Sequence, residues 1–353
     1  MTLRARTAAT LLPLAVLLAA CGPAGGPADG PADAPATDGA PDAAEVTDGG
    51  TPLQVVAAFY PLEHLVRTVG GEHVEVSTLT APGIDPHDVE LTPRQVAGLG
   101  EADLVVYQDG MQAAVDAAVQ QQAPDHSLDV VPAADLILLD ESEQEHAEHA
   151  GEPVDDTDHG EDEGQAEHAD GDTDDSHDHG TEDPHFWLDP QRYDDVAQAV
   201  VAELARLDPA HADDYAVNGQ AFSDVMSDLD ARLAEGLATC ESRDVVTTHE
   251  AFGYLGARYD LHVVGITGVS PESEPSPARL AEVTELVREL GVGAVYTEPL
   301  LPEAIARTVA QETGTRVLVL DPADGIGEGS VGEDYESIML ANLETLREGQ
   351  GCS

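Results

Sequence analysis

Residues 53–79, LQVVAAFYPLEHLVRTVGGEHVEVSTL, decide the class of fold. The stretches 53–59 and 74–79 are short apolar runs, and we expect strands there. Between them, residues 62–69 have the apolar spacing of a helix. A strand, a helix and a second strand in succession are typical of a parallel sheet with helices on its faces.

The same alternation continues on both sides of a long central stretch. It predicts the following elements: helix 93–100, strand 103–107, helix 111–119, strand 244–248, helix 252–259, strand 262–266, helix 277–290, strand 294–297, helix 302–313, strand 316–320 and helix 335–348. Residues 190–238 are helical for most of their length, with a break or bend expected at Pro209. We therefore expect an α/β fold of two Rossmann-like lobes with parallel sheets, joined by a long linking helix.

Changes in composition set the expected boundaries along the chain. They predict six segments: a signal peptide at 1–20, a tether at 21–50, an N-terminal α/β lobe at 51–139, an acidic histidine-rich loop at 140–183, the linking helical segment at 184–240 and a C-terminal α/β lobe at 241–353.

Acidic residues dominate the composition. The 353 residues include 70 Asp and Glu against 14 Arg and no Lys, so the formal net charge is −56 at pH 7. Such a chain cannot neutralise a phosphate backbone, which excludes a nucleic-acid-binding protein. It also has no basic face with which to dock on anionic lipid. A strongly negative surface attracts cations, although a halotolerant or acid-rich proteome would explain the same composition.

The first 20 residues resemble an export signal. Arg4 and Arg6 precede an apolar run at residues 11–20 that is too short to span a bilayer. The run ends in Leu-Ala-Ala-Cys-Gly at residues 18–22, which resembles the lipobox of bacterial lipoproteins and implies cleavage before Cys21 and acylation of its thiol. We expect an exported protein that is held only by this lipid on the outer face of the cytoplasmic membrane. An ordinary cleaved signal with a chance cysteine is the alternative.

Two further cysteines, Cys240 and Cys352, remain in the chain. An exported protein meets an oxidising compartment, so an even pair predicts one structural disulfide. Two isolated thiols are the alternative.

Four residues with metal-binding side chains stand at strand ends or in the loops that follow strands. His87 follows the strand 74–79, and His185 lies where the acidic loop gives way to the linking segment. His249 closes the strand 244–248, and Asp321 ends the strand 316–320. Ligands in open α/β sheets bind beyond the carboxyl ends of the strands, so we expect these side chains to meet in a cleft between the lobes. Three imidazoles and one carboxylate suit a tetrahedral zinc site.

The motifs around these residues resemble those of the zinc- and manganese-binding solute-binding proteins of bacterial ABC importers. The matching segments are Asp-Pro-His at 85–87, Pro-His-Phe-Trp-Leu-Asp-Pro at 184–190, His-Glu-Ala-Phe-Gly-Tyr at 249–254, Glu-Pro-Ser at 274–276, Thr-Glu-Pro at 297–299 and Leu-Asp-Pro at 320–322. The resemblance covers nearly everything from residue 53 onward. It implies a monomeric protein that binds one transition-metal ion between two lobes and delivers it to a membrane permease and its ATPase.

The resemblance also implies a ligand set and a metal. It places the ligands at His87, His185, His249 and Asp321. Relatives that resemble manganese binders usually have a carboxylate at the third position, so His249 favours Zn²⁺ as the transported ion. A manganese-binding homologue, or a shift of register that brings in Glu250, is the alternative. Glu274 and Glu298 resemble residues that support ligands or contact the permease, although either can simply stabilise a loop.

Histidines are also concentrated in the acidic loop. We expect weak, reversible zinc binding there, so that the loop collects ions for the main site; a merely solvated acidic loop is the alternative. The six histidines of the loop are His146, His149, His159, His168, His177 and His179. Five others have no motif around them and are expected to be surface or packing residues: His64, His73, His126, His211 and His262.

Two other classes of function compete with metal transport. A zinc-dependent hydrolase needs an open coordination position and a general base. The His-Glu-x-x-His protease motif is absent, because Gly253 stands where the second histidine would be. We therefore expect a binding protein and not an enzyme. A surface adhesin-like lipoprotein without an importer is the other alternative.

Overall fold

Two parallel sheets of four strands form the framework of a computed structural model that describes residues 51–138, 182–271, 275–327 and 329–353. The first sheet has the order β2-β1-β3-β4 and contains β1 (Leu53–Ala57), β2 (Val74–Thr78), β3 (Leu104–Tyr107) and β4 (Ser127–Asp129). The second has the order β10-β9-β7-β8 and contains β7 (Asp244–Thr247), β8 (His262–Gly265), β9 (Ala294–Thr297) and β10 (Arg316–Val319). Every pair of neighbours within these sheets is parallel. The predicted α/β class with two lobes is confirmed.

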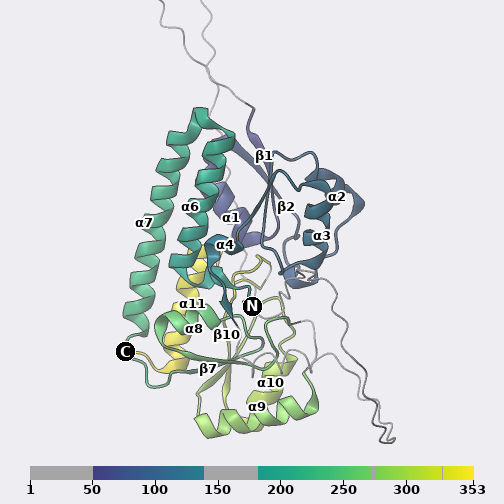
Figure 1. The fold of residues 1–353 in the computed structure, drawn as a ribbon. Coiled ribbons are helices and arrows are strands. Elements are labelled where there is room, and N and C mark those ends of the chain that lie inside the picture. Colours follow the sequence, from purple (N-terminus) through teal and green to yellow (C-terminus); the bar gives the residue numbers. More distant parts are fainter. Residues whose placement is uncertain (1–50, 139–181, 272–274, 328) are drawn as a thin grey trace, which may run out of the picture. The chain divides into compact units, whose positions relative to one another are not determined.

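Helices cover the first sheet on both sides (Figure 1). They are α1 (Tyr60–Gly70), α2 (Pro93–Leu99), α3 (Ala113–Gln122) and the short α4 (Val131–Ala134), with 3-10 turns η1 (Gly71–His73) and η2 (Pro86–Asp88). Helix α1 has a proline in its first turn, where no backbone donor is lost. Its apolar stripe, which includes Leu62, Leu65 and Val69, is fully buried in the core. Helix α2 begins with a capping box between Thr92 and Gln95.

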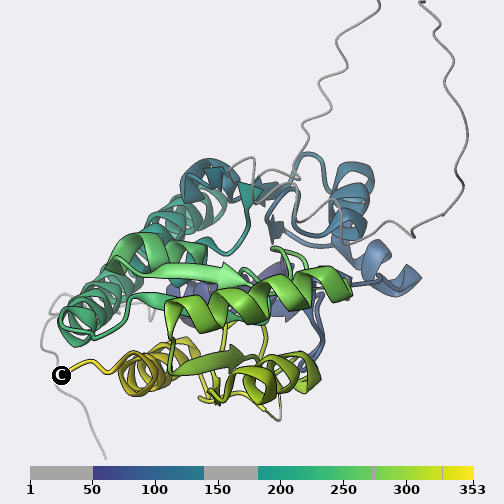
Figure 2. The same ribbon diagram turned by 90° about the horizontal axis from the view of Figure 1, so that it is seen from below.

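The second sheet is also covered on both faces, and Figure 2 brings its helix α9 (Pro277–Leu290) to the front. Alternate strand residues face opposite ways. Val246 and Val295 pack in one cluster with residues of α9 and α10 (Ala304–Thr313). Val245 and Tyr296 instead pack in the main core, together with residues of α8 (Gly253–Tyr259) and α11 (Tyr335–Gln350). The predicted helices and strands of this lobe are present, and where an end differs from the prediction the shift is one or two residues.

The linking segment is a helical hairpin and not one long helix. Helix α6 (Pro190–Leu207) ends before Pro209, a 3-10 turn η5 (Pro209–His211) follows, and α7 (Ala212–Leu237) runs back beside α6 (Figure 1). The helices approach closely at Gly219, where a Cβ atom would lie 2.8 Å from Val201. Helix α7 contacts α1 of the first lobe and α8 and α11 of the second. The break predicted at Pro209 is therefore a reversal of the chain.

A two-residue ribbon separates the first lobe from the linking helices. Strand β5 (Ile137–Leu138) pairs antiparallel with β6 (Glu182–Asp183). The expected signal peptide, the tether with Cys21, and the acidic loop with its six histidines (His146, His149, His159, His168, His177 and His179) lie outside the described residues, except that 182–183 belong to the ribbon.

The predicted disulfide joins Cys240, shortly after α7, to Cys352 at the end of the chain. It confirms the paired state over two isolated thiols. In the part of the chain that the structure describes, no helix combines the length and apolar character needed to cross a membrane.

Candidate metal centre

Three histidines from distant segments meet where the two lobes join. His87 lies in η2 after β2, His185 follows the ribbon strand β6, and His249 follows β7. The Nε2 atom of His185 is 3.2 Å from Nε2 of His87 and 3.4 Å from Nε2 of His249. One ring nitrogen from each residue lies within 4.8 Å of the others. We call these residues the histidine triad.

These separations match a tetrahedral metal site. Two nitrogens that bind one zinc ion at about 2.0–2.1 Å with tetrahedral angles are about 3.3–3.4 Å apart. The observed 3.2 and 3.4 Å therefore leave room for one ion between the rings.

A buried carboxylate orients His185. The backbone N–H of His185 donates to Oδ1 of Asp183 at 2.9 Å, and its Nδ1 lies 2.8 Å from the same oxygen. Since Nδ1 donates its proton there, Nε2 keeps its lone pair for the triad. Both side chains are buried, and burial raises the pKa of Asp183 to about 7. Asp183 is a functional residue that was not predicted from the sequence.

Glu298, at the end of β9, does the same for His249. Its Oε2 contacts Nδ1 of His249, and its Oε1 accepts from the backbone N–H of His249 at 3.0 Å and from the hydroxyl of Thr248. Supporting a ligand is one of the two roles that the family resemblance left open for Glu298. Glu274, the other residue named with it, lies outside the described residues.

The pKa values of the triad differ according to these partners. Burial, together with the neighbouring imidazoles, holds the pKa of His87 well below its usual range. Burial does the same for the pKa of His185, with His249 adding to the effect. Burial also lowers the pKa of His249, but the charge and hydrogen bond of Glu298 outweigh it, so the net shift is upward. His87 and His185 are therefore neutral near pH 7, which is the form that binds metal.

Two carboxylates, neither of them Asp321, lie beside the triad. Asp85, His87 and Asp324 each offer a ligand atom within 4.8 Å of the others, and we call them the carboxylate triad. Asp85 also accepts the backbone N–H of His87 at 2.9 Å, which fixes η2. Asp324 is only 4% exposed, and its Oδ1 has no hydrogen-bond partner among the described residues. Burial, then the charge of Asp85, holds the pKa of Asp324 well above its usual range.

Asp321, the predicted fourth ligand, is a member of neither triad among the described residues. Its carboxylate accepts the backbone N–H groups of Ala323 at 2.9 Å and of Val331 at 3.2 Å. Its own backbone N–H and carbonyl pair with the side chain of Asn342. Asp321 thus holds the loop after β10. The two aspartates three positions apart in Leu-Asp-Pro-Ala-Asp at 320–324 were the signal that a second carboxylate was available.

The remaining histidines of the described chain and Glu250 lie outside both triads. Each histidine has another partner, as expected for packing and surface residues. The contacts are His64 with Tyr193, His73 with Asp214, His126 with the carbonyl of Leu99, His211 with Asp208, and His262 with Asp244.

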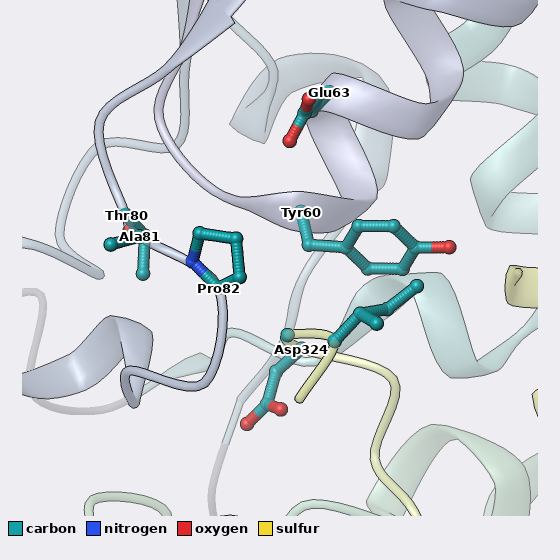
Figure 3. A pocket seen from close by; sticks show the side chains of 8 residues that line it. Tyr60, Glu63, Thr80, Ala81, Pro82 and Asp324 are labelled. Carbon is teal, nitrogen blue, oxygen red and sulfur yellow. The ribbon is translucent and has the colours of Figure 1, made fainter. Parts of the chain in front are cut away.

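A small cavity lies against Asp324 (Figure 3). Tyr60, Glu63 and Pro82 form part of its wall, and the carboxylate of Asp324 points away from Tyr60 and Glu63. Its volume is about 40 Å³, which holds a few water molecules but no organic solute. None of the three histidines lines this cavity, so it is not the space between the imidazole rings.

Comparison with known proteins fits this geometry. Residues 55–349 match the model of the family described as "Zinc-uptake complex component A periplasmic". The chain belongs to this family. This description names a component of a zinc-uptake complex, which is a transport role and not a hydrolytic one.

Individual relatives agree with the family assignment. The high-affinity zinc uptake system protein ZnuA of Bacillus subtilis is 31% identical over 85% of this chain and 88% of that protein. The zinc-binding lipoprotein AdcA of Streptococcus pneumoniae is 31% identical over 84% of this chain and 55% of that protein, so the chain spans about half of AdcA. The Zn(II)-bound ZnuA-like domain of the pneumococcal AdcA has a TM-score of 0.65 and 28% identity, over 85% of this chain and 99% of that domain.

Proposed function

We propose that the chain captures one Zn²⁺ ion at the histidine triad and delivers it to the permease of an ABC importer. The convergence of three imidazole nitrogens, 3.2 and 3.4 Å apart, carries this proposal. Neutral imidazoles prefer borderline ions such as zinc over the harder manganese ion. The zinc-binding names of the relatives support the same metal.

Asp324 completes the ligand set in this proposal, in place of Asp321. Its unpaired Oδ1 is free to bind an ion, whereas both carboxylate oxygens of Asp321 accept backbone N–H groups. Asp85 and Asp324 each offer an oxygen within 4.8 Å of a ring nitrogen of His87, which also belongs to the histidine triad. Four protein ligands close the coordination of the ion, which suits binding and release and not hydrolysis.

Metal analysis tests the proposal directly. Protein purified without chelator should contain one zinc per chain, and zinc should displace manganese in competition. His185→Ala should abolish tight binding, because it removes the central nitrogen of the triad. His262→Ala, an exposed histidine with its own aspartate partner, is the matched control and should bind as wild type. Equal zinc affinity in both variants would reject the histidine triad as the site.

The cellular role is proposed from the family. We infer that the partners are an importer permease and its ATPase, that the protein is a monomer, and that a lipid on Cys21 holds it outside the cytoplasmic membrane. A deletion strain should fail to grow when zinc is chelated, whereas loss of an adhesin would not affect growth under chelation.

Two further variants test the anchor and the acidic loop. Cys21→Ala should release the protein from the membrane fraction. Deletion of residues 141–181 should impair uptake only at scarce zinc if the loop collects ions.

A further inference from the structure

We propose that the carboxylate triad is a second cation site, which receives the ion before the histidine triad does. The inference rests on the proposed function and adds a step to it. The incoming ion first binds Asp85, His87 and Asp324, and it then exchanges Asp85 for the nitrogens of His185 and His249. His87 belongs to both triads, so the ion never has to be released between them.

The burial of the residues gives the two triads an order. Asp85, which belongs only to the carboxylate triad, is partly exposed, whereas His185 and His249, which belong only to the histidine triad, are 0% and 1% exposed. An ion from solvent therefore meets Asp85 before it meets His185 and His249. Oxygen ligands also suit a hydrated cation better than nitrogen ligands do.

Asp324 supplies an independent sign that a cation belongs there. The residue is 4% exposed, and its Oδ1 is buried without a hydrogen-bond partner. An unpaired buried carboxylate is costly unless a cation or donor compensates it. In the described part of the chain, neither Asp85 nor Asp324 forms an ion pair with an arginine. A bound divalent ion would supply the missing positive charge.

Contacts between the two loops hold these carboxylates opposite each other. Asp85 belongs to the loop after β2, and Asp324 to the loop after β10. The backbone N–H of Gly83 donates to the carbonyl of Ile326 at 2.9 Å, which joins the loops across the lobes. At Gly327 a Cβ atom would lie 3.1 Å from the Cα of Gly83, so the backbones touch at this point. The site is therefore built by the fold and does not depend on two mobile side chains meeting by chance.

Stopped-flow kinetics can separate the two steps. Trp187 is the only tryptophan, and its ring centroid is 5.3 Å from that of His185, so its fluorescence reports arrival at the histidine triad. In Asp85→Asn the side-chain oxygen still accepts the His87 N–H, so η2 stays capped. Removing this charge should slow association with Zn²⁺ roughly tenfold, within the range of electrostatic effects on cation capture. Asp88→Asn, an exposed neighbour in the same loop, is the control and should change the rate less than twofold. Equal rates in the two variants would overturn the proposal.

A second measurement looks at the outer site alone. His185→Ala removes a ligand of the histidine triad but none of the carboxylate triad. This variant should still bind about one Mn²⁺ per chain weakly, seen as loss of the free-ion EPR signal, and adding Asp85→Asn should remove that binding. His249→Gln provides a second background if His185→Ala does not fold, as judged by circular dichroism. Absence of residual binding in a folded variant, or residual binding that survives Asp85→Asn, would overturn the second site. Failure of the wild type to bind zinc would instead reject the proposed function.

Discussion

Replacing Asp183 by asparagine tests how His185 is prepared for a metal. Two donors of His185 share one carboxylate oxygen of Asp183, at 2.9 Å for the backbone N–H and 2.8 Å for Nδ1. The other oxygen packs on α8, where a Cβ atom at Gly253 would lie 2.6 Å from it. Asparagine keeps the shape but removes the negative charge that makes the imidazole a better donor of electrons to the ion. Loss of such a partner weakens metal binding by about 10–100-fold, equivalent to about 1.4–2.8 kcal/mol.

In Asp183→Asn the stability of the metal-free protein should change little, even though the zinc affinity falls. Burial makes the charged form of Asp183 unfavourable, whereas asparagine at this position carries no charge that must be buried. We therefore expect Asp183→Asn to unfold thermally within a few degrees of wild type, while competition with a chromogenic chelator shows the loss of zinc affinity. Asp244→Asn is the matched control, because Asp244 also pairs with a histidine, His262, but far from the triad in an exposed position. Zinc affinity of Asp183→Asn equal to that of this control would refute the reasoning.

Three further outcomes follow from the same contacts. Asp324→Asn should weaken zinc binding with little loss of stability. Asp321→Asn should instead lower the free energy of unfolding by about 1–3 kcal/mol, because one buried backbone N–H loses its acceptor. Calorimetry and zinc titration together distinguish the two variants, and the reverse result would restore Asp321 as the ligand. Cobalt(II) should quench the fluorescence of Trp187 at one equivalent, and this quenching should disappear in a variant of the histidine triad. Cys352→Ser should lower the free energy of unfolding by up to about 4.7 kcal/mol, since the bridge to Cys240 closes a span of 112 residues. The zinc affinity of this variant should stay within twofold of wild type. A larger loss of affinity would show that the disulfide shapes the site.

The alternating strands and helices of the two lobes were predictable from sequence because they have strong local signals. The strands that were not predicted, β4, β5 and β6, have weak local signals. Strand β4 (Ser127–Asp129) has a single large apolar residue, Leu128, and its three residues are only half-buried. Strands β5 and β6 have two residues each, too few for any periodic pattern. Their pairing depends on contacts with distant residues, since the hydroxyl of Tyr254 accepts from the backbone N–H of Ile137 and donates to the carbonyl of Asp183.

The linking helices show the same limit on a larger scale. Pro209 predicts that a straight helix must end near this residue. The direction in which the chain continues depends on packing, because α7 returns along α6 and the two helices come close at Gly219, beside Val201. The proline therefore predicts where the helix breaks, whereas the hairpin depends on contacts between α6 and α7 that the local sequence does not reveal.

His87 and His249 were predictable because each follows a strand of a parallel sheet, and parallel strands place their carboxyl ends at one edge. The signal for His185 was instead its Pro-His-Phe-Trp-Leu-Asp-Pro motif at 184–190. Asp321 and Asp324 could not be told apart as candidate carboxylate ligands, because both are in the loop after β10 and only the backbone distinguishes them. Ala323, between them, has a left-handed φ of 55°, which non-glycine residues rarely adopt. Its N–H donates back to Asp321, so that the first aspartate is used to stabilise this turn. The turn leaves Asp324 without a backbone donor on Oδ1 and beside His87. Backbone strain of this kind persists where the surrounding structure requires it, commonly at functional sites, which agrees with the proposal that Asp324, and not Asp321, binds the ion.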